Sequence, residues 1–208
     1  YLKKKKKILQ VQNKALELSM FLSLPASVAL FIGSDEIISA LFGYGSFSEE
    51  AVTNSAQALF YFGLGLPAFA LIKVFSTFFF ANHDTKTPFY VSLFSVILNV
   101  IISIYYFKSV GFIIIPIATS ISSWFNSILL FIFLKNRDLF QFNEIFIIRF
   151  IKISFSSFLM GIFFKYVIMF FENQLVYDYY FKSFFLLLSV ILGLIFYLLI
   201  SLLIKAFK

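Results

Sequence analysis

Long apolar stretches separated by short polar breaks dominate the pattern of this sequence. A membrane-crossing helix needs about 20 consecutive apolar residues. On that basis the pattern predicts six spans, at residues 15–33, 51–80, 88–107, 113–134, 147–171 and 181–204. The sequence therefore predicts an all-α integral membrane protein.

Composition supports this prediction and excludes most soluble classes of protein. Hydrophobic residues make up 61% of the chain and charged residues only 13%, against about 25% charged in soluble domains. With no cysteine and a single histidine, His83, the chain offers neither disulfides nor the ligands of a zinc site. It also has no nucleophile–base set, no phosphate-binding glycine loop and no paired carboxylates within a span, so we do not expect an enzyme.

Basic residues are distributed unevenly between the two sides of the predicted membrane. Thirteen of the 17 lie on the side of the N-terminus and three lie opposite, which makes the N-terminal side cytoplasmic by the positive-inside rule. The expected organisation is a cytoplasmic basic segment at 1–14, four spans within 15–134, a cytoplasmic linker at 135–146 and a C-terminal helix pair at 147–208. The lysine run Lys3–Lys7 is then an anchor for anionic lipid rather than a nucleic-acid site.

Small and polar residues recur at helical spacing inside four of the predicted spans. The four stripes are Ser92, Ser95, Asn99 and Ser103; Thr119, Ser122, Ser123 and Asn126; Ser154, Ser157, Gly161 and Lys165; and Ser189, Gly193, Tyr197 and Ser201. Each stripe lies on one helical face. Two interpretations fit: interhelical packing, with hydrogen bonds worth about 0.6 kcal/mol each, or the wall of a wet cavity. The third and fourth spans are the stronger case for a shared polar surface.

Lys73 is a charged residue within the second span. It lies eight residues before Ala81, about 12 Å from the cytoplasmic end at 1.5 Å per residue. An ionisable residue at that depth is a functional candidate, although its ammonium could also snorkel to the interface.

The polar loop after the second span carries the most specific motif. Residues 79–88 read Phe-Phe-Ala-Asn-His-Asp-Thr-Lys-Thr-Pro, and residues 41–47 read Leu-Phe-Gly-Tyr-Gly-Ser-Phe. Together with Asn99, Gly111, Ala118–Ser120 and Trp124, these segments resemble the MviN/MurJ family, the flippases that carry the lipid-linked peptidoglycan precursor across the bacterial inner membrane. The chain departs from the family pattern at Tyr44, usually Arg, at Thr77, commonly Pro, and at Phe80, commonly Tyr.

The resemblance implies a transporter of the multidrug/oligosaccharidyl-lipid/polysaccharide exporter type, of which this chain would be a six-helix C-terminal fragment with both ends cytoplasmic. Its partners would be membrane lipids, the lipid-linked precursor and the missing N-terminal bundle of the same protein, with no nucleic acid. The predicted substrate-cavity or motif residues are Lys73, Asp84, Lys86 and Arg149. No cofactor is expected.

The resemblance also implies a monovalent cation, sodium, in the complete protein. Its ligands would be Asn99, Ser103, the carbonyl of Ile115 and Thr119. Ser103 replaces an acidic ligand of the family pattern, so the site would need a carboxylate from the missing bundle.

Two other functions stay open at this stage. One is a related exporter of polysaccharide-lipid or drugs, which would share the architecture. The other is a membrane scaffold or an inactive fragment without transport.

The charge asymmetry predicts that positions 5 and 208 face the cytoplasm, while positions 46 and 177 face the periplasm. Single cysteines introduced into this cysteine-free chain, labelled from outside with an impermeant thiol reagent, measure this directly. We expect label only at positions 46 and 177. Labelling of position 208 from outside would contradict the six-span topology.

Overall fold

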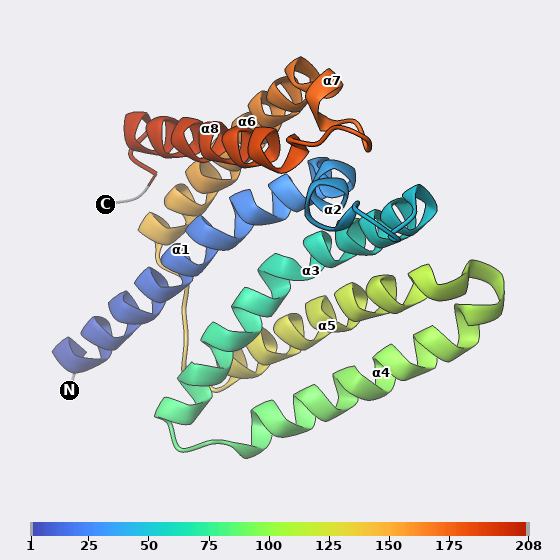
Figure 1. Ribbon diagram of the computed structural model, residues 1–208. Coiled ribbons are helices and arrows are strands. Elements are labelled where there is room, and N and C mark those ends of the chain that lie inside the picture. The colour runs from blue at the N-terminus through green and yellow to red at the C-terminus, as the bar shows by residue number, and fades with distance from the viewer. Residues whose placement is uncertain (1, 207–208) are drawn as a thin grey trace. The chain divides into compact units, whose positions relative to one another are not determined.

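The computed structural model describes residues 2–206, with the backbone alone for residues 2–6, so Lys208 of the topology prediction lies outside the described residues. The described chain is all-helical and short connections join its elements (Figure 1). The elements are α1 (Leu2–Ile32), α2 (Ser34–Phe42), α3 (Glu49–Ala81), α4 (Lys86–Val110), the 3-10 turn η1 (Gly111–Ile113), α5 (Ile114–Asn136), α6 (Glu144–Phe170), α7 (Glu172–Leu175) and α8 (Lys182–Leu203). The predicted all-α class is confirmed.

The long helices have the length and apolar character of membrane spans. Five helical stretches among the described residues qualify: 7–32, 49–81, 86–136, 144–170 and 182–203. The stretch of 51 residues contains both α4 and α5, which fold back along each other around η1 (Figure 1). Each of the six predicted spans therefore has a helix. The chain is a multi-pass membrane protein.

The structure adds detail to the predicted pattern at three places. Helix α1 already begins at Leu2, so the basic segment is helical and continuous with the first span. The predicted breaks at 33–50 and 172–180 contain the short helices α2 and α7. Apolar length cannot predict such short helices, because neither is long enough to cross a membrane.

The chain divides into two compact units. Unit 1 comprises residues 1–23 and 65–151, and unit 2 comprises residues 24–64 and 152–208. Helices α1, α3 and α6 each contribute residues to both units.

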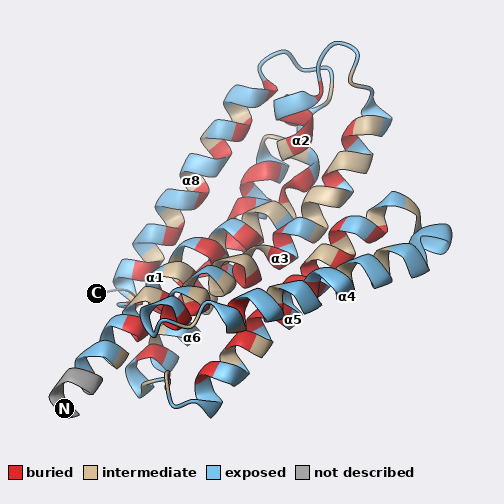
Figure 2. Cartoon of the chain, turned by 90° about the horizontal axis from the view of Figure 1, so that it is seen from below, coloured by how far each residue is buried: buried red, intermediate tan, exposed pale blue. Residues whose placement is uncertain are grey.

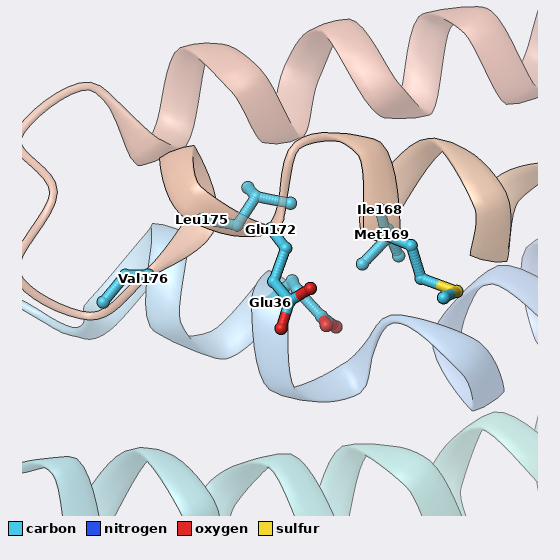
Figure 3. A pocket seen from close by; sticks show the side chains of 6 residues that line it. All are labelled: Glu36, Ile168, Met169, Glu172, Leu175 and Val176. Carbon is cyan, nitrogen blue, oxygen red and sulfur yellow. The ribbon is translucent and has the colours of Figure 1, made fainter.

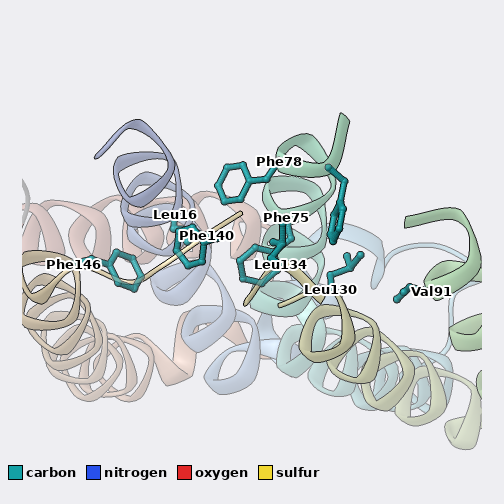
Figure 4. Packing of buried hydrophobic residues seen from close by; sticks show 9 residues of the cluster. Leu16, Phe75, Phe78, Val91, Leu130, Leu134, Phe140 and Phe146 are labelled. Carbon is teal, nitrogen blue, oxygen red and sulfur yellow. The ribbon is translucent and has the colours of Figure 1, made fainter. Parts of the chain in front are cut away.

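An aromatic cluster forms the core of unit 1 (Figure 4). Phe140, in the connection between α5 and α6, is fully buried there. Its ring centroid lies 5.6 Å from that of Phe78 and 6.3 Å from that of Phe75, both on α3. The cluster also includes Leu16, Phe79, Val91, Leu130, Leu134 and Phe146. A phenylalanine outside any helix thus packs against α3 within this cluster.

Two side chains of α1 hold the connection that carries Phe140. Asn13 donates from Nδ2 to the carbonyl of Gln141 (2.9 Å), and its Oδ1 accepts from the backbone N–H of Asn143 (3.1 Å). Gln12 donates to the carbonyl of Leu139 (3.2 Å). These bonds satisfy backbone groups that no helix can satisfy, which buried backbone requires.

Small residues allow the helices of unit 2 to pack closely against one another. A Cβ added at Gly161 of α6 would lie 2.5 Å from Val28 Cγ1 on α1, and one at Gly193 of α8 would lie 3.3 Å from Phe164 on α6. Ser189 and Ser201 on the same stripe of α8 are buried. In the fifth and sixth spans, the stripes therefore serve close helix packing, except at Lys165, which is exposed.

Lys182, the first residue of α8, ties the loops of unit 2 together. Its ammonium is fully buried and donates to the carbonyls of Gly43 (2.6 Å) and Tyr177 (2.5 Å). It also lies 4.3 Å from the ring centroid of Tyr44, the position at which the family pattern usually has Arg. Carbonyls and aromatic faces stabilise a buried cation.

Most side chains of α4 are exposed rather than buried in the core of unit 1. Figure 2 shows pale blue along most of α4, whereas buried residues gather along one side of α5. The exposed side chains of α4 include Phe94, Ile101, Ile104 and Tyr105. Since these side chains are apolar or aromatic, this face suits hydrocarbon.

Candidate functional site

A polar pocket of about 330 Å³ lies between α4, α5 and the part of α3 that belongs to unit 1. Its lining combines two stripes predicted from the sequence with a few apolar side chains: Ser92, Ser95, Asn99, Thr119, Ser122, Ser123 and Asn126, with Phe69, Ile72 and Val96. The helical spacing of the stripes turns these residues to the facing sides of α4 and α5. At the interface with α3, a Cβ added at Gly65 would lie 2.7 Å from Ser120 Oγ, so a glycine allows α3 to approach α5 closely.

Two asparagines join α4 and α5 across this pocket. Asn99 donates from Nδ2 to Thr119 Oγ1 (3.1 Å) and to Ser122 Oγ (3.3 Å). Asn126 donates from Nδ2 to Ser92 Oγ (3.4 Å). The third and fourth spans therefore meet through their polar stripes.

Most hydroxyl groups of the pocket also bond to their own helix. Thr119 donates to the carbonyl of Ile115 (2.8 Å), and Ser122 and Ser123 both donate to the carbonyl of Thr119. Such bonds hold the hydroxyl hydrogens against the helix and leave oxygen lone pairs facing the pocket.

One buried polar atom of the pocket has no partner among the described residues. Asn126 is 7% exposed, and its Oδ1 accepts no hydrogen bond there. A buried amide oxygen needs a donor, from water or from a ligand. The pocket is therefore suited to hydrated or polar contents.

The predicted cation ligands are only partly brought together. Asn99, Thr119 and the Ile115 carbonyl form one hydrogen-bonded chain, but Asn99 turns its amide nitrogen, not its oxygen, toward Thr119. Ser103 is not part of the pocket lining, and its Oγ has no partner among the described residues. A cation needs several oxygens and usually a carboxylate, and no carboxylate lines this pocket. The cation stays a prediction that depends on an acid from elsewhere.

Asp84 organises the loop between α3 and α4. Its carboxylate accepts from the backbone N–H of Thr87 (3.0 Å) and from the Thr87 hydroxyl (2.6 Å), and it forms an ion pair with Arg137. The first of these bonds satisfies a free N–H in the first turn of α4. Thr85, at the N-cap position of α4, makes no side-chain capping bond.

The same contacts shift the acidity of Asp84. The hydrogen bonds from the Thr87 hydroxyl and N–H, with a smaller effect of Arg137, lower the pKa of the Asp84 carboxyl from 3.8 to about 2. Each of these donors stabilises the charged form.

Arg149, the predicted site residue of α6, pairs with an acid of α1. Its Nη1 donates to both carboxylate oxygens of Glu17, at 2.9 and 2.8 Å, and Glu17 is 4% exposed. Breaking a buried pair by removing one partner costs about 3–5 kcal/mol. Arg149 therefore holds unit 1 together, and the pocket does not include it.

The other two predicted site residues make no ion pair among the described residues. Lys73 on α3 and Lys86 at the start of α4 are both exposed. Neither belongs to the lining of the polar pocket.

Sequence reasoning missed the partners Glu17 and Arg137. Glu17 had a signal, since a carboxylate inside a predicted apolar span needs a cation nearby. Arg137 had none, because its pairing with Asp84 joins two loops far apart in the sequence.

Comparison with known proteins identifies relatives of this chain. The sequence profile of the family described as Lipid II flippase MurJ matches residues 2–190. A probable lipid II flippase MurJ of Rickettsia prowazekii is 40% identical over 122 residues, which cover 59% of this chain and 24% of that protein. One of Thermotoga maritima is 37% identical over 143 residues, which cover 69% of this chain and 28% of that protein.

A solved structure extends the similarity to the fold. The protein described as "Lipid II flippase MurJ, inward closed conformation" matches with a TM-score of 0.76 and 26% identity, over 94% of this chain and 39% of that one. The chain thus spans about a quarter of the length of the curated relatives that it matches.

Replacing Asp84 by Ala should lower stability by about 1 kcal/mol at pH 7, the usual cost of a lost cap. The lowered pKa means that the carboxylate contributes fully above about pH 4 and loses its contribution as the pH falls through about 2. Thermal unfolding of wild type and variant in detergent at both pH values measures this. The difference should fall to less than half near pH 2, where the native carboxylate is half protonated, and an exposed control, Asp178→Ala, should show none at pH 7. An undiminished difference at pH 2 would contradict the role of the charge.

Proposed function

Because the chain belongs to the MurJ family of lipid II flippases, which are transporters, we propose that it forms the C-terminal part of a protein that moves lipid II across the bacterial inner membrane. Transport would proceed by alternating access, without making or breaking a covalent bond. The family match over residues 2–190 carries this proposal.

The α4–α5 pocket supports a role in the transport path. A lipid-linked precursor has a polar headgroup that cannot cross hydrocarbon unaided, so the protein must offer it a hydrated surface. Asn99, Thr119 and Asn126 present polar atoms on facing helices of a membrane-spanning pair. In this proposal the pocket forms one wall of the cavity, and the rest of the cavity lies outside this chain.

The ion pairs of unit 1 support movement as a rigid body, which alternating access commonly uses. Glu17–Arg149 joins α1 to α6, and Asp84–Arg137 joins the α3–α4 loop to the end of α5. Asn13 adds hydrogen bonds from α1 to the α5–α6 connection. Charged pairs and backbone bonds of this kind resist bending within the unit.

The orientation that we propose follows from the charges. Asp84, Arg137 and the N-terminus of α6 would face the cytoplasm, and α2 and α7 would face the periplasm. The positive-inside rule supports this arrangement.

Reconstituted vesicles test the proposal. The complete gene product is incorporated into liposomes with fluorescent lipid II, and arrival of the headgroup on the far side is followed with an impermeant reagent. We expect translocation well above that of empty vesicles. Asn126→Ala should slow it about tenfold, equivalent to about 1.4 kcal/mol, because the pocket loses the amide that joins α5 to α4.

Asn136→Ala is the matched control, since Asn136 lies on the same helix but is exposed at its end. It should leave translocation unchanged. Absence of translocation by the wild type would contradict the flippase proposal. An Asn126→Ala rate equal to wild type would contradict only the role of the pocket.

A further inference from the structure

A second pocket, in unit 2, carries a combination of charges and apolar walls that the transport proposal does not use. It has a volume of about 400 Å³ and is lined by Glu36, Ile168, Met169, Glu172, Leu175 and Val176 (Figure 3). An adjoining pocket of about 320 Å³ shares Glu36, Ile168 and Met169 with it and adds Phe31, Ile32 and Lys165. Together the two pockets form one groove, the α2–α6 groove, between the α1–α2 corner and the end of α6.

The charged residues of the α2–α6 groove form no ion pair with any side chain that the structure describes. In Figure 3 the carboxyl groups of Glu36 and Glu172 both point into the space between α2 and the α6–α7 segment. Neither acid, nor Lys165, forms an ion pair among the residues whose side chains are described. Burial, with a smaller effect of the neighbouring carboxylate of Asp35, raises the pKa of the Glu36 carboxyl. An ammonium group in the groove would give Glu36 and Glu172 a cationic partner.

The groove lies where two membrane spans end. The apolar stretches 7–32 and 144–170 end within it, so Ile32, Ile168 and Met169 belong to spans, whereas Glu36 and Glu172 lie just beyond them. A ligand at this level would have apolar groups on the span side and polar groups on the water side. That is the arrangement of a phospholipid at the interface.

We propose that the α2–α6 groove binds a phospholipid whose headgroup carries a primary amine, of the phosphatidylethanolamine type. Its ammonium lies between Glu36 and Glu172, its phosphate lies toward Lys165, and the upper part of an acyl chain runs along Phe31, Ile32 and Met169. The bound lipid joins the α1–α2 corner to α6 and α7. This inference does not depend on the transport proposal.

Charge and hydrogen bonding favour this headgroup over others. An anionic glycerol headgroup would place a net negative charge against two carboxylates and one lysine. A quaternary ammonium has no N–H to donate to the carboxylates and prefers aromatic cages, whereas Phe31 is the only aromatic residue lining the groove. A primary ammonium has three donors and can reach both acids.

Native mass spectrometry of the complete gene product tests the proposal. The protein is delipidated in mild detergent and titrated with phosphatidylethanolamine, phosphatidylcholine or phosphatidylglycerol of identical acyl chains. We expect preferential retention of phosphatidylethanolamine by the wild type. Glu36→Gln and Glu172→Gln should each weaken its binding about tenfold, because each removes a charge-assisted hydrogen bond while preserving side-chain size.

The variant Lys165→Gln tests the phosphate contact separately from the ammonium contact. It should weaken phosphatidylethanolamine binding, because it removes the positive charge that faces the phosphate. Glu50→Gln is the matched control, since Glu50 is an exposed acid of α3 outside the groove; it should bind like wild type.

Three results would overturn the proposal. The first is equal retention of all three lipids by the wild type. The second is unchanged binding in Glu36→Gln and Glu172→Gln. The third is binding of Mg²⁺ or Ca²⁺, removed by chelator and by both variants, without any lipid preference, which would make the acid pair a cation site instead. The measurement needs no lipid II, so its outcome is separate from that of the translocation assay.

Discussion

Every buried backbone N–H and C=O group of a membrane protein must find a partner within the protein, and the rest of this structure depends on that constraint. Helices satisfy it along their length, so the critical places are the breaks between them. At three of these places a side chain completes the bonding: Asn13 at the α5–α6 connection, Asp84 at the start of α4, and Lys182 at the loops of unit 2. These three residues belong to different sequence regions, yet each holds a connection that apolar packing alone could not hold.

The same constraint explains how far sequence reasoning reached. Six helices were predictable, because about 20 apolar residues can do little else in a membrane than form a spanning helix. The facing stripes of α4 and α5 were predictable too, since helical spacing alone puts Asn99 and Thr119 on polar faces. The helices α2 and α7 were not, because a helix of 9 or 4 residues leaves no apolar run to detect.

Pairing between residues far apart in the sequence was the second feature that the sequence could not predict. The sequence identified Asp84 and Arg149 as candidates, but not their partners Arg137 and Glu17, which lie 53 and 132 residues away. Lys182 is one of the three basic residues that the sequence places opposite the N-terminal side, and its burial against Gly43 and Tyr177 is visible only in the structure. The burial of a lysine without a carboxylate partner among the described residues depends on carbonyls and rings that only the folded loops bring together.

The two pockets differ in their lining. The groove of unit 2 has apolar walls and charges that form no ion pair among the described side chains, which suits an amphipathic ligand that stays bound. The pocket between α4 and α5 contains neutral amides and hydroxyls that already bond to one another, with the oxygen of Asn126 left over. A neutral, hydrated surface can contact a polar headgroup without trapping it, which a transport path requires.

If the α4–α5 pocket lines a hydrated path for the substrate, as we propose, position 126 must be accessible to solvent in the membrane. Asn126→Cys is introduced into a version of the complete gene product without other cysteines and treated in membranes with a small impermeant thiol reagent. Ile128→Cys, an exposed apolar position on the same helix, is the control. We expect labelling at position 126 that slows when lipid II is added, and little labelling at position 128. Absence of labelling at position 126, or labelling unaffected by lipid II, would contradict it.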